Sequence, residues 1–504
     1  MSIDEPLSAD HLETCIKVLS SFNSNVKYPL LETEQFDTLR HLIHDLFHLR
    51  KKLKKKNRQD ERAKIKSIDK NTKNSCLLRA GRAEKLQQLQ LQQILVPDGT
   101  VEIKPTHPSI EHKSSFSFQR LQERRPCYIC KLNYRTLHFF YDSLCPSCAQ
   151  FNFEKRVQTT DLSNHVALVT GARVKIGYRI LLKLLHANCF VIATTRFPMD
   201  LLNRLSKEHN FDQWKTRIHV YGIDFRFPYL IEIFTQMIIN KYDRLDFLIN
   251  NACQTIQRPK EFYQHLIANE RLNNYSNLSI EHQEILDGNR QFYQQLCPEQ
   301  AIAYSSQSSS TTTNEICPKI YFDVNQQPID FRSTNSWMLR LNDLSANEIN
   351  EVLTINTLAP FILNSKLKVL MSDKHPEPNG IKFIINVSAM EGSFSRRNKT
   401  DKHPHTNAAK AALNMMTRTS ASDYQKSNIY MVSVDTGWIN DEKPLERAYK
   451  SMIHRDFQTP LDEEDAAARV LDPIISTYQQ LSQGKTNINI PYGCFLKDYR
   501  QCDW

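Results

Sequence analysis

The sequence has little glycine and no long apolar run. Only 11 of its 504 residues are glycine, about a third of the ~7% that is usual in proteins, so each glycine counts where a motif needs one. No stretch approaches the ~20 consecutive apolar residues of a membrane-spanning helix. Residues 1–9 lack the basic and then apolar profile of a signal peptide. We therefore expect a soluble, intracellular protein that makes no membrane contact.

Positive charge is not spread along the chain but gathered in one segment. The net charge is +10, and residues 50–74 supply 12 Lys and Arg against 3 Asp and Glu, which is +9, so the remainder is close to neutral. We interpret the run Lys51–Lys56 as a solvated helix face, which leaves a nuclear location open beside a cytoplasmic one. Aromatic residues interleaved with the basic ones, as in base-stacking surfaces, are lacking. Nucleic acid is therefore not an expected partner.

Segments of different character follow one another along the chain. Residues 1–120 combine helical patterns with a linker at 97–117, and predict a basic helical arm. Residues 121–156 hold paired cysteines. Residues 157–504 alternate apolar strands with amphipathic helices, which predicts an α/β fold with a Rossmann-type, doubly wound parallel sheet. A polar insertion at 257–335, expected to be partly disordered, interrupts this pattern. The expected strands are 165–170, 190–194, 218–221, 245–249, 383–386 and 430–434.

Four of the 12 cysteines stand in two CxxC pairs, Cys127/Cys130 and Cys145/Cys148, with 14 residues between the pairs. This spacing predicts tetrahedral thiolate coordination of Zn²⁺ in a ribbon-like module. Four sulfurs leave no open position for a substrate, so we expect a structural zinc. We expect residues 138–141 to form a covering hairpin strand. A structural or protein-contact role is favoured over nucleic-acid binding. The other cysteines are scattered, which suits metal binding better than a disulfide framework.

A glycine turn follows the first expected strand of the large domain. Residues 170–177 read Thr-Gly-Ala-Arg-Val-Lys-Ile-Gly and lead into a helix, the context in which backbone N–H groups bind a pyrophosphate. This motif resembles the TGxxxGxG turn of the short-chain dehydrogenase/reductase family, with Lys175 at the place of the middle glycine. The resemblance extends over about residues 160–504 and implies nucleotide binding.

Further motifs of that family occur in the expected order. The second strand ends in Thr194-Thr195-Arg196 without an acidic residue, which favours NADP(H) over NAD(H), because an arginine accommodates the extra phosphate. Asn250-Asn251-Ala252 matches the family's NNA motif, and Thr436 stands where a proline contacts the nicotinamide amide. The resemblance implies cofactor contacts by Thr170, Gly171, Arg173, Lys175, Ile176, Gly177, Arg196, Asp224, Asn250, Asn251, Ala252, Lys410 and Thr436.

The catalytic residues of the family are only partly present. Lys410 and Asn356 match the family's lysine and asparagine, but Thr406 stands in place of the tyrosine acid, and Ala389, next to Ser388, in place of the serine. A threonine hydroxyl is far less acidic than a phenol. Three interpretations stay open: a neighbouring imidazole, His403 or His405, delivers the proton; Glu391 or Ser393 reaches the substrate; or Thr406 caps a helix at 407–419.

Together these features predict an atypical NADP(H)-dependent oxidoreductase acting on an unidentified carbonyl or alcohol. The expected catalytic residues are Lys410, Asn356, Thr406, His405 and Ser388. The rival hypothesis is a catalytically inactive nucleotide-binding scaffold that works on a protein partner through the zinc module. The family resemblance also implies a homodimer or tetramer, paired through helices at 348–363 and 407–423.

Overall fold

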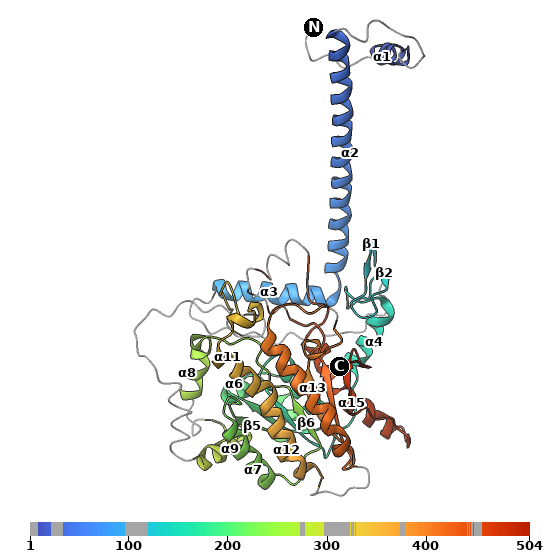
Figure 1. Cartoon of the computed structure of the whole chain (residues 1–504). Coiled ribbons are helices and arrows are strands. Elements are labelled where there is room, and N and C mark those ends of the chain that lie inside the picture. The colour runs from blue at the N-terminus through green and yellow to red at the C-terminus, as the bar shows by residue number, and fades with distance from the viewer. Residues whose placement is uncertain are drawn as a thin grey trace, which may run out of the picture. The chain divides into compact units, whose positions relative to one another are not determined.

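The computed structural model describes two compact units, Met1–Asp69 and Lys70–Trp504. The linker expected at 97–117 and most of the stretch 297–328 lie outside the described residues. Elements are labelled in Figure 1. The described residues are 9–21, 34–95, 119–272, 278–296, 323, 327, 329–372, 380–396, 398–440, 442, 444, 447 and 456–504.

The described residues of the first unit, 9–21 and 34–69, are helical. The unit holds α1 (Ala9–Ser21) and most of α2 (Glu34–Asn74), one uninterrupted helix of 41 residues (Figure 1). Many residues of α2 are charged, and several of its apolar side chains are exposed to solvent. Phe47, for example, is 71% exposed. Among the residues that the structure describes, no helix combines the length and apolar character needed to cross a bilayer.

The four-cysteine segment folds as a hairpin and a helix. Strands β1 (Arg120–Pro126) and β2 (Asn133–Thr136) pair antiparallel, and α4 (Pro146–Val157) follows. The strand expected at 138–141 is wrong. The carbonyl oxygens of Phe139 and Phe140 instead accept the N–H groups of Leu77 and Leu78, which open α3 (Leu77–Leu95). This segment and the large domain lie in the same compact unit.

The large domain is built on a sheet with the order β5-β4-β3-β6-β7-β8-β9-β10. All neighbouring strands are parallel except β9 and β10. The α/β fold and the six expected strands are confirmed, whereas no sequence pattern indicated β9 and β10. The bounds are β3 Val166–Thr170, β4 Phe190–Thr195, β5 Ile218–Gly222, β6 Phe247–Asn250, β7 Lys382–Ser388, β8 Ile429–Asp435, β9 Phe495–Lys497 and β10 Arg500–Cys502.

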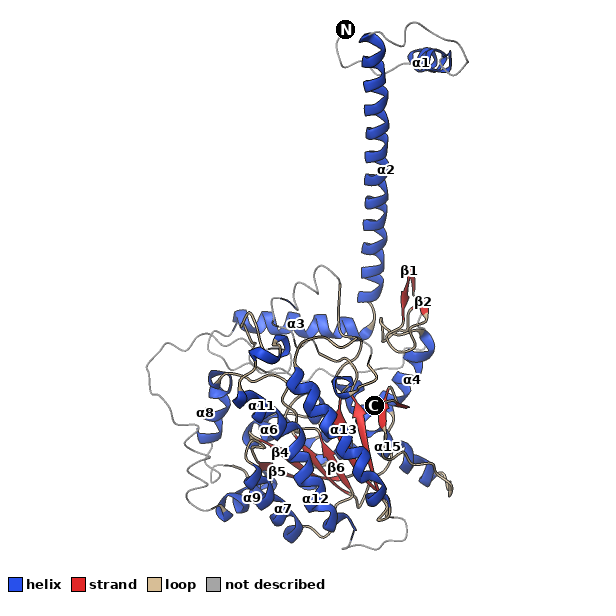
Figure 2. Cartoon of the chain, in the orientation of Figure 1, coloured by secondary structure: helices blue, strands red, loops and turns tan. Residues whose placement is uncertain are grey.

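Helices cover both faces of the sheet, so its central strands are mainly apolar, as is usual for parallel sheets. On one face lie α5 (Lys175–His186), α6 (Pro198–Leu205) and α15 (Glu463–Ser482). The other face carries α7 (Pro228–Lys241), α12 (Ala359–Ser372) and α13 (Pro404–Gln425), the last two crossing the strands in Figure 2. Helix α11 (Ala346–Leu353) continues into α12 through a π-helical turn, Thr354–Leu358. Short 3-10 turns lie at Phe211–Gln213, Lys215–Arg217, Lys260–Tyr263, Ser336–Met338, Leu341–Asp343 and Met390–Gly392.

Part of the polar insertion is folded against the sheet. Helix α8 (Gln264–Leu272) packs on α6, and α9 (Ile280–Gln295) packs on the outermost strand β5. The side chain of Asn289 in α9 accepts the backbone N–H of Gly222 at 2.6 Å, and the Tyr293 hydroxyl donates to the Gly222 carbonyl at 3.2 Å. The insertion thus supplies partners for backbone groups at the end of the edge strand.

Candidate functional site

The glycine turn joins β3 to α5 at the carboxyl edge of the sheet. Gly171 has φ +67°, and a Cβ there would lie 2.9 Å from the Cα of Ala252. At Gly177 a Cβ would overlap the carbonyl oxygen of Gly171. Lys175 itself adopts φ +54°, a left-handed conformation that favours glycine. At Lys175 the backbone therefore keeps the left-handed conformation that a glycine would adopt there. Ile176, the next residue, packs against the core.

The NNA segment after β6 holds this turn in place. The hydroxyl of Thr170 accepts the N–H groups of Asn251 and Ala252, both at 2.9 Å. The Asn251 amide donates back to the Thr170 carbonyl at 3.0 Å. Asn250 instead turns into the sheet, where its amide donates to the side chains of Asn364 and Asn386 at 2.7 and 2.8 Å. The structure thus separates the roles of the two asparagines.

Arginines gather beyond the ends of β4 and β5, on one side of the glycine turn. The Arg196 guanidinium lies 4.4 Å from the ring centroid of Tyr263, a residue of the insertion. Burial opposes ionisation of Asp224, but hydrogen bonds from Arg226 and the charge of Arg196 hold the pKa of that carboxyl below its usual value. Arg173 is buried and donates to Asp200 at 2.8 Å and to Gln327 at 2.9 Å. Its guanidinium is therefore engaged with protein groups.

A half-buried glutamate from the insertion lies at the start of α6. Glu270 accepts the N–H groups of Met199 and Asp200 at 3.0 and 3.3 Å. Burial raises the pKa of Glu270 to about 7, against the opposing effect of these two hydrogen bonds. The folded chain therefore keeps this proton to higher pH than the unfolded chain, whose glutamates titrate near 4.5.

This shift predicts a pH dependence of stability. The contribution of Glu270 is fully present below pH about 4.5 and is lost as the pH rises through about 7, an effect of at most ~3 kcal/mol. Urea midpoints measured between pH 4.5 and 8 should show this decline, and the Glu270→Gln variant should lack it. Glu261→Gln, at an exposed glutamate of the neighbouring turn, is the control. Equal pH profiles for wild type and Glu270→Gln would contradict the assignment.

On the other side of the turn, Lys410 and Asn356 occupy ordered positions. The Lys410 ammonium is buried and donates to the carbonyl of Val387 at 2.7 Å. Asn356 lies in the π-helical turn, a distortion that is frequent at functional sites. Its side-chain amide accepts the Gln254 N–H at 2.8 Å and donates to the Gln254 carbonyl at 2.9 Å. Helices α12 and α13 are thereby tied to the loop after β6 and to β7.

Three predicted catalytic side chains are buried without hydrogen-bond partners among the described residues. They are the Ser388 and Thr406 hydroxyls and both ring nitrogens of His405. His405 Nε2 is 4.0 Å from the carboxylate of Glu348, a residue that no sequence motif indicated. Burial lowers the pKa of His405, and the charge of Glu348 opposes this. Buried polar groups without partners are costly, so each of these groups needs a partner that the described residues do not supply.

His403, Glu391 and Ser393, which the sequence also allows as proton donors or substrate contacts, have protein partners. His403 stacks on Trp337, with ring centroids 3.8 Å apart. Glu391 accepts from Arg396 at 2.6 Å, and the Ser393 hydroxyl is 2.9 Å from that of Ser395. These engagements favour His405 over the three of them.

Capping by Thr406 is wrong, because α13 already begins at Pro404. The residue at its N-cap position is His403, with φ +44°. Because the left-handed His403 directly precedes Pro404, the helix begins three residues before the expected start at residue 407. Thr406 therefore lies inside the first turn of α13.

The loop after β8 meets the loop after β7 through one carboxylate. Asp435 accepts the N–H groups of Met390 and Gly437 at 2.9 and 3.0 Å, and Lys497 of β9 donates to it at 3.1 Å. Thr436 lies between Asp435 and Gly437 at the carboxyl edge. The Trp438 side chain is 42% exposed and its ring centroid is 4.7 Å from that of Phe457. These loops form the second half of the candidate site.

The four cysteines come together as their spacing predicts. Their Sγ atoms all lie within 4.8 Å of one another, with Cys130 and Cys145 3.6 Å apart. Tetrahedral Zn–S bonds of about 2.3 Å place sulfurs ~3.8 Å apart, so the cluster fits such an ion. The backbone N–H of Cys145 points to the Cys127 sulfur at 3.3 Å. Donors of this kind stabilise thiolate ligands.

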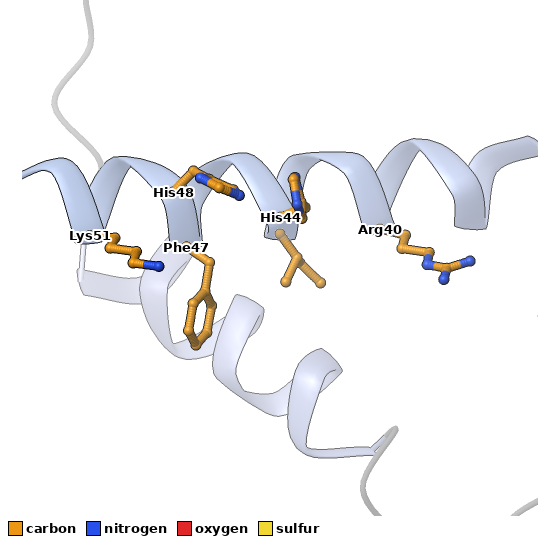
Figure 3. A pocket seen from close by; sticks show the side chains of 6 residues that line it. Arg40, His44, Phe47, His48 and Lys51 are labelled. Atoms are coloured by element: carbon orange, nitrogen blue, oxygen red, sulfur yellow. The ribbon is translucent and has the colours of Figure 1, made fainter.

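A shallow hollow of the first unit has a different character. It lies along α2 and is lined by Arg40, Ile43, His44, Phe47, His48 and Lys51 (Figure 3). All six side chains are exposed, and the His44 and His48 rings are 4.4 Å apart. Every residue of the candidate site belongs to the second unit instead. We assign this hollow no part in the chemistry.

Comparisons with known proteins give a family model and several similar proteins. The family model "short chain dehydrogenase" matches residues 165–273 and 333–447. The uncharacterized protein R665 of Acanthamoeba polyphaga mimivirus is 31% identical over 393 residues, 75% of either chain. Carbonyl reductase from chicken fatty liver, solved with NADPH, is 18% identical and covers 68% of this chain and 100% of its own (TM-score 0.37). RhlG of Pseudomonas aeruginosa, solved with NADP, is 17% identical, with 62% and 90% covered (TM-score 0.38).

Proposed function

Because the chain belongs to the short-chain dehydrogenase/reductase family, we propose that it is an NADP(H)-dependent oxidoreductase acting on a carbonyl or alcohol substrate. One observation carries the proposal. The clamped glycine turn lies at the carboxyl edge between β4 and β6, the site where open α/β sheets bind dinucleotides, and Ser388 and Lys410 lie at the same edge beside β7. NADP(H), when bound, supplies or accepts the hydride.

Binding would use both sides of this edge. The N–H groups of the turn and of α5 would bind the pyrophosphate, and Lys175 would add positive charge beside it. We expect Arg196, whose guanidinium lies over the Tyr263 ring, to contact the 2′-phosphate. Lys410 would bind the ribose of the nicotinamide half, and Thr436 its carboxamide. Asn356 holds the π-helical turn against the loop after β6 through its hydrogen bond to the Gln254 carbonyl.

Proton transfer would fall to His405 or Thr406. Reduction of a carbonyl needs a hydride at carbon and a proton at oxygen, and an imidazole near neutral pH can supply the proton. Burial lowers the pKa of His405, and the charge of Glu348, whose carboxylate is 4.0 Å from Nε2, opposes this shift in part. The Thr406 and Ser388 hydroxyls would orient the carbonyl oxygen. The second candidate, an inactive nucleotide-binding scaffold, is favoured by Thr406 and Ala389 in place of the family's tyrosine and serine.

The cofactor preference predicts the effect of one charge reversal. Arg196→Asp should weaken NADPH binding about 10- to 100-fold, because it replaces a charge-assisted contact with phosphate by a repulsion, and should change NADH binding little. Fluorescence or calorimetric titration of the full chain measures both. Lys207→Asp, the same change at an exposed residue, is the control. Binding of neither cofactor by the wild type would contradict the oxidoreductase proposal. Tight NADPH binding without turnover over a carbonyl panel would favour the scaffold.

We also propose that the four cysteines hold a structural zinc ion, with all four positions filled by sulfur. Copies of the chain are expected to pair through α11, α12 and α13 as a homodimer or tetramer. These helices and the turn between the first two expose Leu358, Phe361 and Met415, which are 41%, 55% and 57% accessible. A cytoplasmic location is proposed, with a nuclear one left open by Lys51–Lys56.

A further inference from the structure

A tyrosine of the first CxxC pair reaches the candidate active site. Tyr128 lies between Cys127 and Ile129, and its hydroxyl accepts the backbone N–H of Trp438 at 3.0 Å. Its own N–H donates to the Ser143 carbonyl at 3.0 Å. The ammonium of Lys497 lies 6.0 Å from the Tyr128 ring centroid. The residue that bonds the loop after β8 therefore belongs to the metal knuckle.

Two neighbouring backbone N–H groups of the loop after β8 have side-chain acceptors. Asp435 accepts the N–H of Gly437, and Tyr128 accepts the next one, at Trp438. Gly437 has φ +78°, so the chain turns sharply between the two hydrogen bonds. Asp435 also holds Met390 after β7. One side of the turn is thus bonded to the sheet and the other side to the cysteine module.

The module is itself firmly attached to the large domain. Leu461 is buried in the apolar cluster of the module, and Ile439 packs against that cluster. Arg156 of α4 donates to Asp462, the N-cap of α15, at 2.9 Å and pairs with the buried Asp465 at 2.9 Å. The Tyr141 hydroxyl donates to Asp465. Both described ends of the segment between β8 and α15 are therefore packed on the module.

We propose that Tyr128 is a positioning residue for the nicotinamide half of the cofactor, through which metal binding by the four cysteines is coupled to cofactor binding. The inference rests on the proposed function. Coordination fixes Cys127 and Cys130, and hence Tyr128 between them. Tyr128 fixes the Trp438 amide, and with it Thr436, which the proposed function assigns to the nicotinamide carboxamide. The adenosine half would bind over β4 and β5, at the far side of the glycine turn from this contact.

The test uses the zinc-loaded full chain and two probes. NADPH reports both halves of the site, and 2′,5′-ADP reports the adenosine half alone. Tyr128→Phe should weaken NADPH binding roughly 10-fold, because one backbone N–H loses its acceptor, while 2′,5′-ADP binding and zinc content stay unchanged. Tyr134→Phe is the matched control, since its hydroxyl donates to Asp142 within the module. It should leave both affinities unchanged.

Hydrogen exchange supplies a second measurement. The Trp438 amide should exchange about 10-fold faster in Tyr128→Phe than in the wild type, because its hydrogen bond is lost, while the amides of β8 keep their rates. Unchanged NADPH binding, an equal loss for both probes, or unchanged exchange at Trp438 would overturn the inference and leave the proposed function intact. A wild-type chain that binds 2′,5′-ADP and NADPH equally poorly would overturn the proposed function and the inference with it.

Discussion

Gly177→Ala should weaken NADPH binding by a factor of at least about 100. The added Cβ would overlap the Gly171 carbonyl oxygen and approach the Asn251 side-chain nitrogen to 2.5 Å. Neither group can retreat, because Asn251 holds the turn through Thr170 and Gly171. The turn must therefore open, and the N–H groups that would face the pyrophosphate lose their positions. Fluorescence titration with NADPH measures the loss.

The matched control is Gly81→Ala, at a helical glycine of α3 with no atom within 4 Å of an added Cβ. Alanine is favoured over glycine inside a helix by about 1 kcal/mol, so this variant should bind NADPH normally and unfold at a slightly higher temperature. Wild-type affinity in Gly177→Ala would show that the turn between β3 and α5 is not the cofactor site. The thermal midpoint of each variant separates lost binding from lost folding.

Cys127→Ser should release zinc and lower the thermal midpoint of the second unit by about 5–10 °C. Cys127 is buried in the apolar cluster of the module, together with Tyr141 and Leu144. A serine would put a hydroxyl at a buried metal position and leave three thiolates with a weaker fourth ligand. Arg156 and Tyr141 of the module both contact Asp465 of α15. Loosening of the module should therefore destabilise the large domain as well. Metal analysis and calorimetry are the measurements.

Cys15→Ser controls for the loss of a cysteine as such, because Cys15 is an exposed residue of α1. It should keep one equivalent of zinc and the wild-type melting temperature. Full zinc content in Cys127→Ser, or a wild-type chain that purifies without zinc and does not take it up, would count against a zinc site. Addition of a chelator to the wild type should reproduce the shift seen in Cys127→Ser.

Local patterns allow most of the large domain to be predicted from the sequence. Apolar runs of four to seven residues mark buried strands, and a glycine turn between a strand and a helix has a recognisable form. Strands β9 and β10 leave no such pattern, because each has three residues and the sheet position of both depends on long-range contacts. The strand expected at 138–141 failed for a similar reason: its carbonyl groups are bonded to residues 77 and 78, about 60 positions earlier.

In the candidate site too, residues of short local motifs could be predicted, and residues placed by long-range packing could not. Cofactor motifs are short and contiguous, so Thr170, Asn251 and the four cysteines could be found directly. Glu348 could not, because its place beside His405 depends on the packing of α11 against α13. The hydroxyl of Tyr128 and the amide of Trp438 are 310 positions apart. No local pattern indicates that the cysteine pair and the loop after β8 meet.

The contact between α9 and β5 has a consequence for solubility. The outermost strand of a sheet offers unpaired backbone groups to other chains and invites strand addition and aggregation. In this protein Asn289 and Tyr293 bond the N–H and the carbonyl of Gly222. At the opposite margin, β10 is only three residues long. The described helices of the polar insertion add no strand to the sheet, and we expect α9 to hinder the addition of a further strand at this edge.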